Sequence, residues 1–241
     1  MAREKVVAHL KKVGNGHVAV AVRDRRSGVM LAVGATRFQT ASIVKVEILA
    51  ALLLRARQRD QQVSDADRRL AKKMIVLSDN AAATALYRRI GGKSGLQSAN
   101  EAFGLRESTP NASWGLSTTT AADQVRLLAS LLDEDGPLGD EDRRFIFDAM
   151  SQVDQTQAWG VRAAADPRTT GVYVKNGWDT VADDQDRWQV NTIGRLVEPG
   201  HDWLVAVLSN HHRNQAAGVR IVETVLRYTL RELRALPVAA T

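Results

Sequence analysis

The stretch Ala41-Ser42-Ile43-Val44-Lys45 opens the run Val46–Leu54 (VEILAALLL), which is too apolar for a helix lying on a surface. Ser42 and Lys45 are three residues apart, so on a helix their side chains share a face. A serine hydroxyl is a weak nucleophile until a neighbouring base accepts its proton. A lysine can be that base when burial disfavours its ammonium form. The same pattern also fits a capping serine beside a solvated lysine, and the other motifs of the chain decide between the two.

Composition excludes several classes of protein. The chain has 241 residues, of which 44% are hydrophobic and 25% charged, which is ordinary for one soluble domain or two small lobes. There is no cysteine, so disulfides, thiol nucleophiles and thiolate metal sites are excluded. His211 and His212 are adjacent and the other histidines stand alone, so we expect no metal and no cofactor.

The net charge of +6 comes mainly from scattered arginines. Aromatic residues are not interleaved with them, so we expect a solvated basic face and no nucleic-acid partner. A basic surface favours acidic substrates such as carboxylates. Residues 1–10 lack the apolar core of a signal peptide, which leaves the cytoplasm, or secretion to the periplasm or beyond if the chain has been trimmed. No run reaches membrane-spanning length, and we expect a monomer.

Hydrophobic periodicity predicts a mixed α/β (α+β) fold. The expected strands cover residues 18–22, 29–33, 170–174, 188–192 and 203–209. The expected terminal helices cover residues 4–12 and 218–235, and the residues between the two groups of strands are mostly helical. Because strands come from both ends of the chain, we expect an α/β lobe formed by residues 1–36 and 156–241. An all-helical lobe of residues 37–155 interrupts it, with a cleft between the lobes.

Two further motifs follow Ser42-Ile43-Val44-Lys45 along the chain, namely Ser78-Asp79-Asn80 and Lys175-Asn176-Gly177. In the predicted structure the three motifs lie at a helix start, at a turn between helices and at the end of a strand. Similar triplets occur elsewhere. Ser98-Ala99-Asn100 lies inside a predicted helix, and Lys93-Ser94-Gly95 lies between two helices, where no substrate-binding strand can form. The order and context of the chosen three are therefore distinctive.

This set of motifs resembles that of the penicillin-recognising serine enzymes, which include class A β-lactamases and D,D-peptidases. The resemblance covers nearly the whole chain, because the order of strands and helices also matches. It implies a single domain over residues 1–241, with an antiparallel sheet flanked by the terminal helices and an inserted all-helical lobe.

The resemblance implies three catalytic residues. Ser42 attacks an acyl carbonyl carbon, and Lys45 removes or relays the proton of its hydroxyl group. Ser78 passes a proton to the leaving amine. Asp79 is expected to be structural and to bond the backbone beneath its turn.

The resemblance also implies five substrate-binding residues. Asn80 hydrogen-bonds a substrate amide, and Lys175 is a fixed positive charge for a substrate carboxylate. Gly177 lets the substrate approach the strand, and the backbone N–H of Trp178 joins that of Ser42 in an oxyanion hole. Asn176 replaces the hydroxyl residue usual in the family, which removes one donor to the substrate carboxylate.

The loop before Thr118 is short, and in class A β-lactamases this loop carries a glutamate that activates the deacylating water. Glu107 and Asn111 have the spacing of that glutamate and its asparagine partner. However, Phe103-Gly104-Leu105 resembles the start of the family loop, which places Glu107 too early. Glu107 is thus a candidate deacylation base, with a solvated loop glutamate as the alternative.

These features predict a serine acyl-enzyme hydrolase acting on β-lactams or on peptide-like amides that carry a carboxylate, with weak deacylation. One alternative is a biosynthetic serine acyltransferase or amide hydrolase. A second is a β-lactam-binding or peptidoglycan-binding sensor domain that stays acylated.

Overall fold

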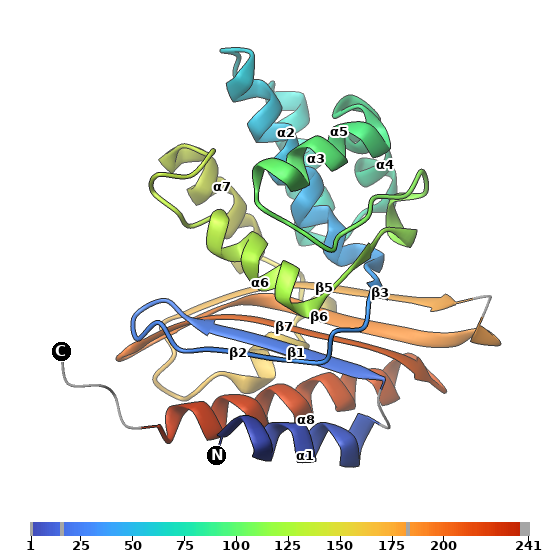
Figure 1. Cartoon of the computed structure of the whole chain (residues 1–241). Helices are drawn as coiled ribbons and strands as arrows, with labels where there is room; N and C mark the ends of the chain where they lie inside the picture. The colour runs from blue at the N-terminus through green and yellow to red at the C-terminus, as the bar shows by residue number, and fades with distance from the viewer. Residues whose placement is uncertain (1, 15–16, 182–183, 237–241) are drawn as a thin grey trace.

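The computed structural model describes residues 2–14, 17–181 and 184–236 (Figure 1). The α-helices are α1 (Ala2–Gly14), α2 (Val44–Gln58), α3 (Asp65–Val76), α4 (Asn80–Arg89), α5 (Gly92–Ala102), α6 (Ala121–Ser130), α7 (Asp140–Ser151) and α8 (Gln215–Arg234). The strands are β1 (Val18–Asp24), β2 (Met30–Val33), β3 (Phe38–Gln39), β4 (Thr118–Thr119), β5 (Gly171–Val181), β6 (Arg187–Glu198) and β7 (His201–His212). Short 3₁₀ helices are η1 (Ala41–Ile43), η2 (Trp114–Leu116), η3 (Gln155–Gln157) and η4 (Gly160–Ala164).

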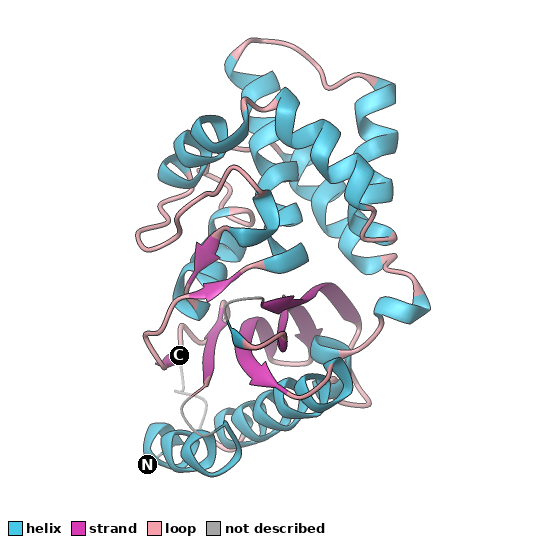
Figure 2. Cartoon of the chain, turned by 90° about the vertical axis from the view of Figure 1, so that its right-hand side faces the viewer, coloured by secondary structure: helices cyan, strands magenta, loops and turns pink. Residues whose placement is uncertain are grey.

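Five strands form one antiparallel sheet in the order β2-β1-β7-β6-β5. Strands from the two ends of the chain meet where β1 pairs with β7, as the order of elements predicted. Helices α1 and α8 cover one face of this sheet, with η4 packed against α8, and the remaining α-helices lie on the other face (Figures 1 and 2). The predicted antiparallel sheet with terminal helices and an inserted helical segment is therefore confirmed.

Strand β1 shows why both faces of the sheet are covered. Its alanines, Ala19 and Ala21, belong to the core shared with α2 and the other inserted helices. Its valines, including Val20 and Val22, belong to a second core shared with α1 and α8. Successive side chains of a strand point to opposite faces, so this apolar alternation supplies two cores at once.

The proposed division into two lobes stays a prediction, and the structure adds two details to it. Residues 37–155 also contain the two-stranded sheet β3–β4, in which Phe38 pairs with Thr119. Helix α6 packs directly on β1 and β7, so the inserted segment adjoins the main sheet closely. Helix α2 lies in the middle of that segment, and its residues from Val44 to Leu54 are all buried.

Two local expectations were wrong. Residues 175–177 lie in the middle of β5, because the strand continues to Val181. The similar triplet at residues 93–95, which was expected between two helices, lies inside helix α5, which begins at Gly92. Each error concerns an element boundary, where local sequence signals are weakest.

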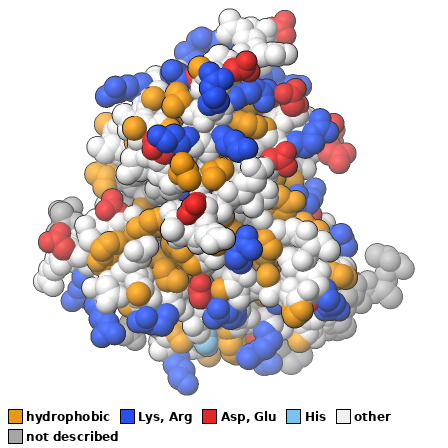
Figure 3. All heavy atoms as spheres, turned by 180° about the vertical axis from the view of Figure 1, so that it is seen from behind, with side chains coloured by type: hydrophobic (Ala, Val, Ile, Leu, Met, Phe, Trp, Pro, Cys, Tyr) orange, Lys and Arg blue, Asp and Glu red, His pale blue; other side chains and the backbone are white. Residues whose placement is uncertain are grey.

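The surface shows no concentration of charge on the face seen in Figure 3. Lysine and arginine side chains are scattered over it, with apolar side chains between them. Among the described residues, no helix is long and apolar enough to cross a membrane.

Candidate active site

Ser42 lies in η1 and Lys45 in the first turn of α2, so both side chains leave the same end of the buried helix. The Lys45 Nζ atom donates hydrogen bonds to Ser42 Oγ at 2.8 Å, to the Ser78 carbonyl at 2.7 Å and to Asn80 Oδ1 at 2.7 Å. The lysine side chain is fully buried. The first two motifs therefore meet at one ammonium group.

Backbone strain marks both of these motifs. Ala41, directly before Ser42, has a φ of 45°, and Ser78 has a φ of 55°. Such left-handed conformations are costly for residues with a Cβ and cluster at functional sites. Asp79 caps α4 by accepting the Ala82 N–H at 2.7 Å, which is the structural role that the sequence indicated.

Lys175 approaches the same group of atoms from β5. Its Nζ atom donates to Ser78 Oγ at 2.9 Å and to the Asn176 carbonyl at 2.8 Å. Lys45 Nζ lies 3.2 Å from the same Ser78 hydroxyl, which therefore stands between two lysines. Both of the lysine contacts are charge-assisted when the ammonium is protonated.

Burial shifts the proton affinity of both lysines. Desolvation lowers the pKa of Lys45 to about 8, and the nearby Asp79 carboxylate opposes this shift. Desolvation also holds the pKa of Lys175 well below its ordinary range, and the charge of Lys45 adds to the effect. A lysine with a pKa near 8 is partly a free amine at neutral pH, so Lys45 has the proton affinity that a general base needs.

Asn176 does not face the substrate side of β5, which corrects the binding role expected for it. Its Nδ2 group donates to the Gln157 carbonyl at 2.7 Å and to the Trp159 carbonyl at 3.2 Å. The side chain is 1% exposed. Asn176 instead ties β5 to the segment that carries η3 and η4, and it presents no donor to a substrate carboxylate.

Close packing explains why position 177 is a glycine, and the sequence alone did not reveal this reason. A Cβ atom at this position would lie 2.7 Å from the backbone nitrogens of Ser42 and Ile43 and from the Thr40 carbonyl. Real Cβ atoms do not approach that closely, so any side chain would displace η1 from β5. The glycine brings the Ser42 backbone against the strand, next to the backbone of Trp178.

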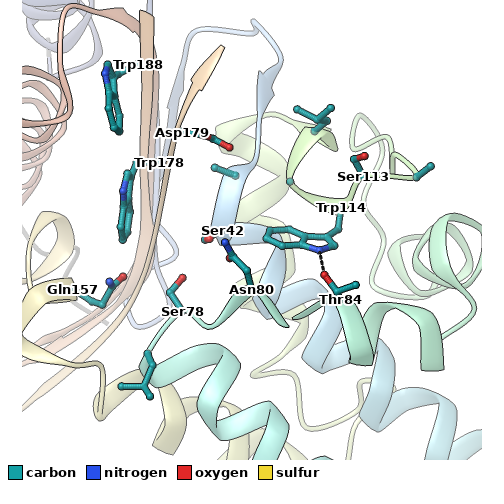
Figure 4. A pocket seen from close by; sticks show the side chains of 15 residues that line it. Ser42, Ser78, Asn80, Thr84, Ser113, Trp114, Gln157, Trp178, Asp179 and Trp188 are labelled. Atoms are coloured by element: carbon teal, nitrogen blue, oxygen red, sulfur yellow. Dashed lines mark hydrogen bonds between the residues drawn. The ribbon is translucent and has the colours of Figure 1, made fainter. Parts of the chain in front are cut away.

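A cleft of about 690 Å³ opens above these groups. The residues that line it are Ala41, Ser42, Leu77, Ser78, Asn80, Thr84, Ala112, Ser113, Trp114, Gly115, Leu116, Gln157, Trp178, Asp179 and Trp188. In Figure 4, Ser42, Asn80 and Trp114 lie on one side of the sheet edge, and Trp178 and Trp188 lie on the other. Asp179 has the one charged side chain among these lining residues. The part of the chain that the structure describes contains no group of acidic, histidine or cysteine side chains that could hold a metal.

Glu107 lies away from the cleft, contrary to its candidate role as the deacylation base. Its side chain is exposed, and its carboxylate accepts a hydrogen bond from Thr120 Oγ1 at 3.3 Å. Asn111 bonds within its own loop, because its Oδ1 atom accepts the Ser113 N–H at 2.9 Å. Neither residue lines the cleft.

Trp114 occupies the part of this loop that does reach the cleft, and the sequence had not marked it as functional. Its indole ring centroid lies 4.8 Å from Lys45 Nζ, and its Nε1–H donates to Thr84 Oγ1 at 3.1 Å (Figure 4). A cation over a tryptophan face is an attractive arrangement. The one signal for Trp114 in the sequence was the short length of this loop, because a shorter loop brings a residue from its later part close to Lys45.

Glu47 was also missed, although it lies two residues after Lys45. It is 2% exposed, and its Oε1 atom accepts the Gln124 Nε2–H at 2.9 Å. Burial raises its pKa to about 7, and the neighbouring Asp123 carboxylate adds to the rise. A carboxyl group within the buried run of α2 is unusual, and Glu47 does not line the cleft.

Comparison with known proteins points to one family. The profile of the β-lactamase enzyme family matches residues 66–230 of this chain. In curated sequences, the chain is similar to the protein named "Putative lipoprotein LppW" of Mycobacterium tuberculosis and Mycobacterium bovis, with 29% identity over 172 residues. This match covers 67% of the chain and 54% of the relatives, so the chain spans about half the length of the curated relatives it matches.

Solved structures agree on the fold. A variant of the last common ancestor of Gram-negative class A β-lactamases has a TM-score of 0.80 and 22% identity, over 97% of this chain and 98% of that one. A mutant of PBP-A, solved as an acyl-enzyme complex with penicillin G, has a TM-score of 0.82 and 19% identity. That match covers 98% of this chain and 97% of the other.

Proposed function

The chain belongs to the β-lactamase enzyme family, and on this premise we propose that it is a serine hydrolase that forms an acyl-enzyme on Ser42. The contact that carries the proposal is the hydrogen bond of 2.8 Å between Lys45 Nζ and Ser42 Oγ. A nucleophile within hydrogen-bond reach of a base of suitable pKa is the arrangement that covalent catalysis requires.

In the proposed acylation, the free amine of Lys45 accepts the proton of Ser42 while Oγ bonds to the acyl carbon of the substrate. The carbonyl oxygen becomes negative, and the backbone N–H groups of Ser42 and Trp178 stabilise it. As the oxyanion collapses, the bond from the acyl carbon to the leaving nitrogen breaks, and Lys45 Nζ returns a proton to that nitrogen through Ser78 Oγ, which lies 3.2 Å away. We propose that Lys175 holds Ser78 for this transfer and that Asn80, which lines the cleft, bonds a substrate amide.

Deacylation is proposed to be slow. Efficient hydrolysis of the ester on Ser42 needs a base beside the attacking water. Glu107, the candidate base, is exposed and outside the cleft. The acyl-enzyme should therefore accumulate. A site that acylates and hydrolyses slowly also fits an acyltransferase or a sensor, and the indole of Trp114 beside Lys45 favours these alternatives over an efficient β-lactamase.

The substrate is proposed to be a β-lactam or a peptide-like amide. The expectation of a substrate carboxylate now rests on Lys175 alone, because Asn176 is turned away and no arginine lines the cleft among the described residues. Since the curated relative is named as a lipoprotein, we also propose a location at the cell envelope, which fractionation of the native host would test.

The experiment that tests the proposal is intact-mass spectrometry of the protein mixed with excess penicillin G, followed from seconds to hours. We expect an adduct that maps to Ser42 and persists while little free penicillin is hydrolysed. The absence of any adduct, with both penicillin and a D-Ala-D-Ala peptide unconsumed, would refute an acyl-enzyme function. Rapid turnover of penicillin would refute slow deacylation alone.

A further inference from the structure

The loop of residues 105–117 is fixed beside Ser42 at both of its approaches to the cleft. The Thr40 N–H donates to the Ser117 carbonyl at 2.7 Å, which joins the end of the loop to the residue before η1. The hydroxyl of Tyr87 donates to the Asn111 carbonyl at 2.7 Å, and the Asn111 N–H donates to Ser117 Oγ at 3.1 Å. The position of η2 relative to Ser42 is therefore set by several hydrogen bonds.

The side chain that this loop presents to Lys45 is an indole. Trp114 is half-buried, its ring lies over Lys45 Nζ, and its N–H is held by Thr84 on α4. Anchoring at both the ring face and the N–H restricts the ring to one orientation. The apolar face of the indole thus lies against Lys45 Nζ, whose four polar contacts are with Ser42, Ser78 and Asn80.

This position matters because of where a hydrolytic water would have to lie. Hydrolysis bonds the water oxygen to the acyl carbon and breaks the bond from that carbon to Ser42 Oγ. One water proton returns to Oγ, and the acyl group leaves as a carboxylic acid. The water must meet both the ester and a base, and Lys45 is the base that contacts Ser42 Oγ. An ordered water needs two to four polar partners, which an indole face does not supply.

We infer that Trp114 is a positioning residue that keeps water away from Lys45 and the acyl ester, and thereby sets the lifetime of the acyl-enzyme. The inference rests on the proposed acyl-enzyme function and names the residue that regulates its second step. Asp179, the one charged side chain among the lining residues, is exposed, and its carboxylate accepts the Thr180 N–H at 2.8 Å, so we do not assign it as a deacylation base.

The test uses p-nitrophenyl acetate, a neutral ester whose acylation appears as a burst of p-nitrophenol and whose deacylation sets the later steady rate. Trp114→Ala should accelerate deacylation by roughly tenfold while the burst rate changes little. This lies below the roughly 10²–10⁴-fold effect of a positioned base, because alanine only admits water. Trp114→Phe should keep a lifetime close to that of the wild type, since it preserves the apolar cover.

Glu107→Gln is the matched control, because it changes the same loop at a position outside the cleft, and its deacylation rate should equal that of the wild type. Thermal melting of each variant checks its folding. If Trp114→Ala is unstable, Thr84→Val tests the same inference by releasing the indole N–H, and deacylation should accelerate to a smaller extent.

The outcomes distinguish a failure of the Trp114 role from a failure of the acyl-enzyme function. A wild-type burst at Ser42 with unchanged deacylation in folded Trp114→Ala and Thr84→Val would overturn the role of Trp114 and leave the acyl-enzyme function intact. Equal changes in the burst and steady rates would also overturn it, because a merely structural role disturbs both steps. No burst and no adduct in the wild type would overturn the proposed function itself.

Discussion

The two sides of Ser42 differ sharply. On the side of the buried lysines, Lys45, Ser78 and Lys175 form hydrogen bonds of 2.7–3.2 Å. On the side of the loop of residues 105–117, the cleft is lined by an indole, small residues and an exposed leucine, Leu116. On the proposed function, the first side supplies the groups for acylation, whereas the described loop residues that line the second side include no acidic or basic side chain. The proposal therefore assigns acylation and deacylation to separate parts of the fold, so that variants of each side should affect different steps.

The largest loss of acylation is expected when the nucleophile beside the buried lysines is removed. Ser42→Ala should abolish covalent labelling by penicillin G or a fluorophosphonate, because removal of a nucleophile typically costs about 10⁶-fold in rate. Peptide mass spectrometry of the labelled protein is the measurement. Residual labelling at another serine would show that Ser42 is not the nucleophile.

Lys45→Ala should slow acylation by roughly 10²–10⁴-fold, the usual contribution of a general base. In the wild type, the burst rate should rise with pH toward the Lys45 pKa of about 8 and level off above it, because the free amine is the reactive form. Stopped-flow bursts between pH 6 and 10 measure this profile. A rate independent of pH would exclude Lys45 as the base.

Lys175→Ala distinguishes two roles of Lys175, namely holding Ser78 and anchoring a substrate carboxylate. Because Lys175 Nζ donates to Ser78 Oγ, we expect slower acylation by both a carboxylate-bearing penicillin and a neutral ester. The loss should be roughly fivefold to a hundredfold, since removal of one partner of a buried hydrogen bond typically costs about 1–3 kcal/mol. A defect confined to the carboxylate substrate would instead support the anchoring role expected from sequence.

The smallest effect on activity is expected at Glu47, which is buried on α2 but does not line the cleft. Its pKa is raised from 4.5 to about 7, so the folded protein holds a proton that the unfolded chain releases between these values. Stability should therefore fall as pH rises through this window, by about 3 kcal/mol once it is complete.

Glu47→Gln removes this titration while keeping an oxygen that can accept from Gln124. The variant should melt higher than the wild type at pH 8 and alike at pH 4, with burst kinetics unchanged. Equal melting temperatures at both values would show that the carboxyl group is not held neutral by the fold.

Much of the fold was predictable because its signals are local. The alternation in β1, the apolar run of α2 and the capping of α4 by Asp79 each depend on neighbours in the sequence. The end of β5 was not, because pairing with β6 extends the strand as far as Val181. Cross-strand hydrogen bonds, and not the residues of β5 alone, decide where that strand stops.

The sequence by itself determined the order of the elements and the residue types of the three motifs, since periodicity and spacing carry that information. Only the tertiary structure decided that Asn176 turns to the η3–η4 segment, that Gly177 lets η1 meet β5, and that Trp114 covers Lys45. Each of these contacts joins segments far apart in the chain. Their geometry follows from how the helices and the sheet pack, which no local pattern of residues specifies.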